Sequence, residues 1–139
     1  MMRHSVVAVA LFAAGIAVGL ASSEMLHAQA PAFVTKQLLH TDLVNLPGQE
    51  VLVSASTWQP GHRLPLHMHP DGHEFTYVIE GEQTLEIDGE GTKVVKAGEL
   101  LYTPPGVVHY GRNASDKELK TLVLRIKPKD KPILVEVKR

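Results

Sequence analysis

Residues 61–81 of the chain read GHRLPLHMHPDGHEFTYVIEG, and four of its eight histidines lie within this stretch. Side chains two positions apart point to the same face of a β-strand, so His67 and His69 can both face the interior of a sheet. The turn at Pro70-Asp71-Gly72 reverses the chain, and Glu74 opens the next apolar segment. Antiparallel pairing would bring its carboxylate beside the two rings. The stretch therefore predicts three converging metal-binding groups.

A fourth such group comes from later in the chain. His109 is a single histidine in an apolar run that follows Pro104-Pro105-Gly106. Three neutral imidazoles and one carboxylate suit a borderline divalent transition metal, such as Fe, Mn, Ni, Cu or Zn, and leave coordination positions for water, substrate or dioxygen. We expect the ion to be held by His67, His69, Glu74 and His109, with His62 in a loop and His73 on the opposite face of its strand.

The rest of the sequence predicts an all-β domain. Beyond residue 30, no ten-residue stretch has the apolar spacing of an amphipathic helix without an interrupting Gly or Pro. Short β-prone segments alternate with turn residues instead, and about eight or nine strands at this spacing are typical of a sandwich or barrel. The expected strands are residues 50–58, 64–69, 74–80, 83–88, 92–96, 100–103, 107–110, 119–127 and 133–137.

Two segments resemble the motifs of the cupin superfamily. Residues 61–81 match the first motif, which is a Gly, five residues, His-x-His, three or four residues, Glu, six residues and Gly. Residues 98–113 match the second motif from its Gly through Pro-x-Gly to His109 and Asn113. This resemblance implies a small single-domain cupin, a double-stranded β-helix or jelly roll, with the metal inside the barrel near one end.

The resemblance does not imply one reaction, since cupins include dioxygenases, isomerases, epimerases, decarboxylases, lyases and binding or sensing modules. We expect a dioxygenase-like oxidoreductase acting on a small organic substrate, with Glu74 as the catalytic proton acceptor. A lyase or isomerase that uses the metal only as a Lewis acid is the second hypothesis. The third is a small-molecule binding or sensing module without turnover.

Residues 1–30 differ from the rest of the chain. After Arg3, residues 6–20 contain only Val, Ala, Leu, Phe, Ile and Gly. This run is shorter than the about 20 residues of a membrane-spanning helix, and it resembles a secretory signal peptide or an N-terminal anchor. We expect cleavage between residues 21 and 30, and a periplasmic or secreted domain over residues 31–139. Membrane contact is expected only if the segment stays uncleaved.

Composition narrows the partners. The 139 residues have the length of one domain, and 14 Lys and Arg against 15 Asp and Glu give a formal charge of −1. No basic cluster with interleaved aromatics stands out, so we expect no nucleic-acid partner. Cysteine is absent, so a metal must be held by nitrogen and oxygen ligands.

Large side chains on the strand of Glu74 predict a covered outer face. Phe75, Tyr77 and Ile79 alternate with Glu74, so they face out of the barrel if Glu74 faces in. Either an N-terminal strand over residues 33–39 or a second subunit would have to cover them. We expect a homodimer.

Overall fold

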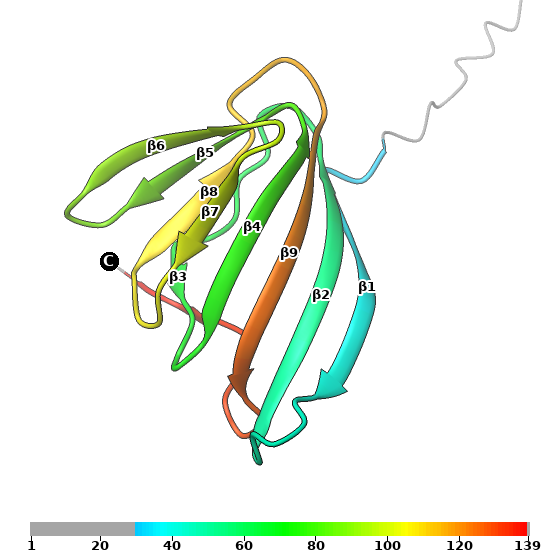
Figure 1. Ribbon diagram of the computed structural model, residues 1–139. Helices are drawn as coiled ribbons and strands as arrows, with labels where there is room; N and C mark the ends of the chain where they lie inside the picture. Colours follow the sequence, from blue (N-terminus) through cyan, green and yellow to red (C-terminus); the bar gives the residue numbers. More distant parts are fainter. Residues whose placement is uncertain (1–29, 139) are drawn as a thin grey trace, which may run out of the picture.

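The computed structural model describes residues 30–138 as two antiparallel five-stranded sheets that face each other (Figure 1). The predicted signal segment falls on residues 1–29, which lie outside the described part. No helix occurs within residues 30–138, and none of sufficient length and hydropathy to cross a membrane is found there. The expected all-β jelly roll is therefore confirmed.

Each sheet combines strands that are far apart in the sequence, as a jelly roll requires. In sheet order, the first sheet contains β1 (Phe33–Asp42), β2 (Gln49–Trp58), β9 (Leu119–Pro128), β4 (His73–Glu80) and β7 (Leu100–Thr103). The second contains β10 (Val135–Glu136), β3 (His67–Met68), β8 (His109–Arg112), β5 (Glu82–Ile87) and β6 (Gly91–Lys96).

Three predicted strands differ from the observed ones by two or more residues at one end or both, and the other predicted strands agree to within one residue at each end. The strand expected at 64–69 is reduced to β3, because the preceding segment contains Pro65, which has no N–H to donate to a ladder. β8 begins at His109 rather than at residue 107, after the turn at Pro104-Pro105-Gly106. β10 is confined to two of the five residues expected at 133–137.

An apolar core fills the barrel at the end of β9 that lies away from Arg125. Trp58 and Leu119 are paired across β2 and β9 and are buried together with Val78 and Val95. The Trp58 indole N–H donates to Thr121 Oγ1 at 3.1 Å, so the ring is satisfied although only 3% exposed. This core fixes β2, β9 and β4 relative to one another, and the same strands continue toward the histidines.

The last glycine of the first motif has a steric role at the end of β4. Gly81 has a φ of 82°, and a Cβ there would lie 2.8 Å from the backbone oxygen of Glu118. A side chain is excluded both by the left-handed backbone and by this contact. Gly81 therefore allows the tight turn from β4 to β5 beside the start of β9.

The outer face of the first sheet is largely apolar. Tyr77 is 40% and Ile79 is 51% exposed, which confirms that the large residues of β4 face out of the barrel. β1 pairs edge to edge with β2 and extends the sheet, so it does not cover this face (Figure 1). Two rows run across the strands in register: Leu39, Val53, Leu124, Phe75 and Tyr102, and Lys36, Ala55, Leu122, Tyr77 and Leu100.

Candidate metal centre

Three histidine side chains converge inside the barrel. His67 on β3 is paired directly with His109 on β8, and His69 follows β3 immediately. One ring nitrogen of each residue lies within 4.8 Å of those of the other two. All three residues are at most 3% exposed. Long-range pairing of β3 with β8 therefore brings together rings that are 40 or more residues apart in the sequence.

Backbone carbonyls fix the tautomer of each ring. Nδ1 of His67 donates to the Pro65 oxygen at 2.7 Å, and Nδ1 of His109 donates to the Val107 oxygen at 2.9 Å. Nδ1 of His69 donates to the Ile133 oxygen at 2.6 Å. A carbonyl can only accept, so each proton is on Nδ1 and each Nε2 keeps a free lone pair. This is the arrangement of metal-binding histidines, whose second nitrogen is held by an outer partner.

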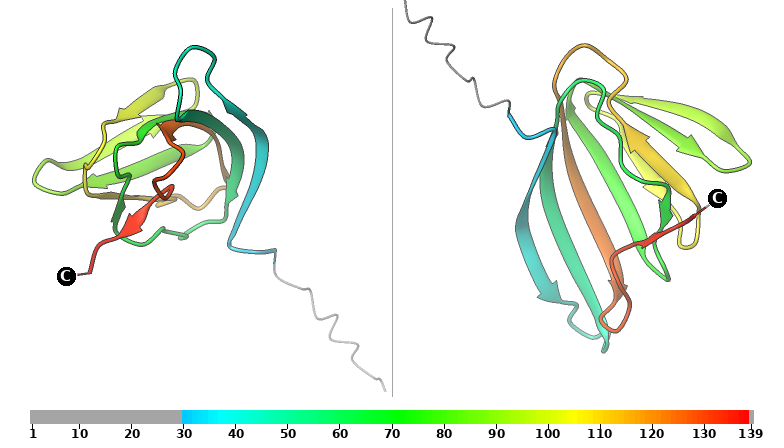
Figure 2. Two further views of the ribbon diagram at one scale, coloured as in Figure 1. Left: turned by 90° about the horizontal axis from the view of Figure 1, so that it is seen from below. Right: turned by 180° about the vertical axis from the view of Figure 1, so that it is seen from behind.

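The partner of His69 comes from the C-terminal segment. This segment crosses the end of the barrel, and β10 pairs with β3 at Met68 and His67 (Figure 2). The segment thus contributes both a strand beside His67 and the Ile133 carbonyl that orients His69. Residues that lie far from the two motifs therefore help to position the predicted ligands.

Glu74 at the start of β4 completes the predicted set of four. Its Oε2 lies 3.1 Å from Nε2 of His69, and its Oε1 lies 3.8 Å from Nε2 of His109. Burial alone would raise the pKa of the Glu74 carboxyl, but the positive charge of Arg125 beside it lowers the pKa, which is held well below its usual range. Glu74 is therefore a carboxylate at neutral pH.

The donor set fits a divalent transition metal. Nε2 of His69 is buried and has no hydrogen-bond partner among the described residues, although buried polar atoms normally have one. Burial lowers the pKa of His67 to about 4, despite its hydrogen bond to Pro65, so its ring is neutral and free to bind a cation. The residues that would hold the ion are His67, His69, Glu74 and His109.

A family model described as a cupin domain matches residues 55–125, which is about half of the chain. The chain is a cupin.

Relatives of this cupin include enzymes of different kinds. It is 38% identical over 70 residues to the polyketide synthase CurC of Streptomyces cyaneus, covering 50% of this chain and 44% of that protein. It is 34% identical over 83 residues to the oxalate decarboxylase OxdC of Bacillus subtilis, covering 56% of this chain and 22% of that protein. The chain thus spans less than half the length of these two relatives.

Solved structures show the same fold. An oxalate oxidase in complex with the substrate analogue glycolate is 25% identical, with a TM-score of 0.58, and the match covers 78% of this chain and 57% of that one. A double-stranded β-helix protein from Klebsiella pneumoniae is 22% identical, with a TM-score of 0.59, over 77% of this chain and 85% of that one.

The two remaining histidines of the first motif lie outside the centre of this cupin, as predicted. His73 points to the outer face of β4, where its Nδ1 is 2.8 Å from the Tyr102 hydroxyl. His62 lies in the loop after β2 and stacks on Phe33 with the ring centroids 5.3 Å apart.

Sequence reasoning missed the role of Arg125. This residue on β9 is paired with Glu74, and its Nη2 lies 2.5 Å from Glu74 Oε2. The two-residue period of a strand was a usable signal, since it sets Arg125 on the face opposite Leu122 and Leu124. The sequence did not show which of these faces was the interior.

The cavity at the metal centre is small. It is lined by His67, Glu74, His109 and Arg125 among others, and offers about 20 Å³ to the centre of a water molecule. One water needs roughly 10–15 Å³ on this measure, so one or at most two fit.

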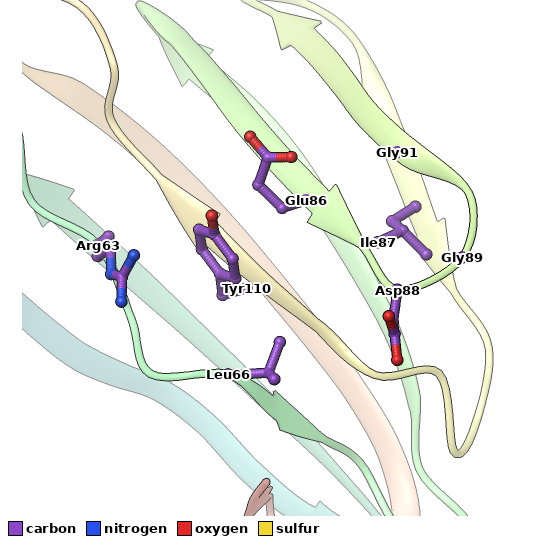
Figure 3. A pocket seen from close by; sticks show the side chains of 8 residues that line it. All are labelled: Arg63, Leu66, Glu86, Ile87, Asp88, Gly89, Gly91 and Tyr110. Carbon is purple, nitrogen blue, oxygen red and sulfur yellow. The ribbon is translucent and has the colours of Figure 1, made fainter. Parts of the chain in front are cut away.

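A larger pocket of about 430 Å³ lies elsewhere in the cupin, on the outer side of β5 and β8 (Figure 3). Arg63 lies over the Tyr110 ring at 5.0 Å from the centroid on one side, and Glu86 lies on the other. Tyr110 points outward, whereas the preceding His109 points inward. None of the four predicted ligands lines this outer pocket.

Proposed function

We propose that this cupin binds one divalent transition metal through His67, His69, Glu74 and His109 and is an oxidoreductase for a small organic substrate. One observation carries the proposal: three buried Nε2 atoms face a common point because three carbonyl groups take up the Nδ1 protons. A similar structure is named an oxalate oxidase, which supports a small organic acid as the substrate.

The bound ion would supply a Lewis acid with open coordination positions and, for Fe, Mn, Ni or Cu, a redox centre. The chain's own residues prepare the site. The barrel excludes bulk water from a cavity that holds one or two water molecules. Glu74 is kept ionised beside Arg125, so it can accept a proton from a substrate but remains a weak base while the pair persists.

A second candidate is a metal-dependent lyase that uses the ion only as a Lewis acid. The relative named an oxalate decarboxylase favours it, because loss of carbon dioxide from an acid needs no net oxidation. A non-catalytic binding module is the third possibility and is an outcome of the test below.

Elemental analysis of the wild type, of His69→Ala and of His73→Ala tests the site. We expect about one metal per chain in the wild type and in His73→Ala, and little in His69→Ala. Equal metal in His69→Ala and the wild type would refute the site. Oxygen uptake with oxalate or glycolate then supports the oxidoreductase, turnover without oxygen uptake supports the lyase, and retention of the acid without product supports the binding module.

We also propose that the protein is exported as a periplasmic or secreted homodimer. The apolar run at residues 6–20 supports export, and the mass of the protein recovered from the periplasmic or extracellular fraction gives the cleavage site. The two rows on the outer face of the first sheet, which are apolar apart from Lys36, support the dimer, since exposed apolar patches mark interaction surfaces.

A further inference from the structure

Arg125 has an unused hydrogen-bonding edge at the metal centre. Its side chain points into the barrel from β9 and is 20% exposed. Nη2 approaches Glu74, whereas Nε is buried and has no hydrogen-bond partner among the described residues. An arginine presents five N–H groups in a fixed planar fork, and carboxylates match that fork with two parallel hydrogen bonds.

The charges around the cavity do not balance once an ion is bound. Among the described residues that line the cavity, Glu74 is the one carboxylate and Arg125 the one guanidinium, so their charges cancel. A divalent ion held by neutral imidazoles adds two positive charges that no second carboxylate offsets. Uncompensated charge in a buried site is costly. The occupied site therefore favours a ligand with two negative charges.

The size and lining of the cavity limit this ligand further. The cavity admits only one or two water molecules, so it excludes large ligands, and even a two-carbon diacid would have to displace this water and move the lining side chains apart. Gln83, only 4% exposed, also lines the cavity, and its Oε1 has no hydrogen-bond partner. Its amide can bind a hydroxyl group or, in the flipped orientation, a carboxylate oxygen.

We propose that Arg125 determines the specificity of this site and selects small dianions, such as dicarboxylates of two or three carbons. One carboxylate would face the four metal-binding residues and the other would bind the free edge of Arg125. The inference rests on the proposed metal site and names the substrate class for it. A lysine would supply the charge without the planar fork.

Calorimetric titration of the zinc-loaded protein with malonate and with acetate tests this role. In the wild type we expect malonate to bind at least about tenfold more tightly than acetate. In Arg125→Met the malonate affinity should fall by roughly ten- to a hundredfold, the usual range for a hydrogen-bonded charge, while acetate changes little. Arg125→Lys should lose part of the malonate affinity. Arg112→Met is the matched control, because Arg112 faces Glu86 outside the barrel.

Metal analysis of each sample after titration distinguishes a failure of the proposed metal site from a failure of the role proposed for Arg125. A wild type that holds no zinc refutes the proposed metal site. Zinc with an unchanged malonate affinity in Arg125→Met, or equal wild-type affinity for malonate and acetate, refutes the role of Arg125 alone. If Arg125→Met does not fold, as judged by thermal unfolding, Arg125→Lys decides, since it keeps the charge opposite Glu74. An unchanged malonate affinity in that variant overturns the proposal.

Discussion

The Glu74 carboxylate lies 2.5 Å from the Arg125 guanidinium, and strand pairing sets the two residues directly opposite each other on β4 and β9. Both side chains point to the barrel interior, where breaking one half of an ion pair leaves an uncompensated charge.

Removal of the Arg125 charge should therefore destabilise the metal-free protein more than the metal-loaded one. We expect Arg125→Met to lower the free energy of unfolding of the metal-free protein by about 3 kcal/mol, as for other broken buried pairs. A bound divalent ion would compensate Glu74 and reduce this loss. Urea unfolding followed by the fluorescence of Trp58, the one tryptophan of the chain, measures both values. Equal losses with and without metal would contradict the prediction.

The metal-free protein should lose stability as the pH falls from about 6.5 to about 4. The pKa of His67 is lowered to about 4 in the fold, so in this window the unfolded chain binds a proton that the folded chain does not. The loss from this residue reaches roughly 2 to 3 kcal/mol. The lowered pKa of Glu74 adds a further loss below pH 4.5, in the same direction.

Urea unfolding at pH 7.5 and at pH 5.0 checks this dependence. His67→Gln should flatten it, whereas His73→Gln, on the exposed face of β4, should leave it as in the wild type. An equal slope in His67→Gln and the wild type would show that another group carries the effect.

A charge on the outer face of the first sheet should separate the proposed dimer. Leu124 lies at the centre of one apolar row, between Val53 and Phe75. Leu124→Glu would place an unpaired carboxylate in the interface, so light scattering should give a monomer for this variant and a dimer for the wild type. Val94→Glu is the control, since Val94 is 51% exposed on β6 of the other sheet. A monomeric wild type would count against the dimer.

Loss of the C-terminal segment should weaken metal binding. A stop after Lys131 removes the Ile133 carbonyl that holds His69 and the strand β10 that pairs with β3. Loss of such an outer partner typically costs 10- to 100-fold in metal affinity. A competition assay with a chromophoric chelator measures the change, and removal of residues 138 and 139 alone is the control. An unchanged affinity after the longer truncation would rule out this positioning role.

The convergence of His67, His69 and Glu74 could be predicted because local spacing determines it. His67 and His69 share a face through the two-residue period of a strand, and Glu74 follows one turn later. His109 was predicted as the fourth ligand because it occupies the histidine position of the second cupin motif. The jelly roll followed from the same motifs together with the strand spacing, and the family match and solved structures bear it out.

Arg125 was missed because the pattern of β9 is inverted. Its more apolar face, with Leu122 and Leu124, points out of the barrel, while Thr121, Val123 and Arg125 point inward. The more apolar face of a strand is the interior face only when the same chain covers it. The Ile133 carbonyl was missed for another reason. It is a backbone group 64 residues away from His69, and every residue type has such a carbonyl, so the sequence does not mark it.

The same bond sets an order for maturation. The His69 ring is held by the backbone carbonyl of residue 133. A ribosome-bound or partly translocated chain that ends before residue 133 therefore contains His67 and His69 but lacks the carbonyl that orients His69. The ligand sphere should reach its full metal affinity only after this segment has emerged and docked. For a chain that crosses a membrane before folding, the choice of metal would then depend on the ions in its destination compartment and not on those where it was synthesised.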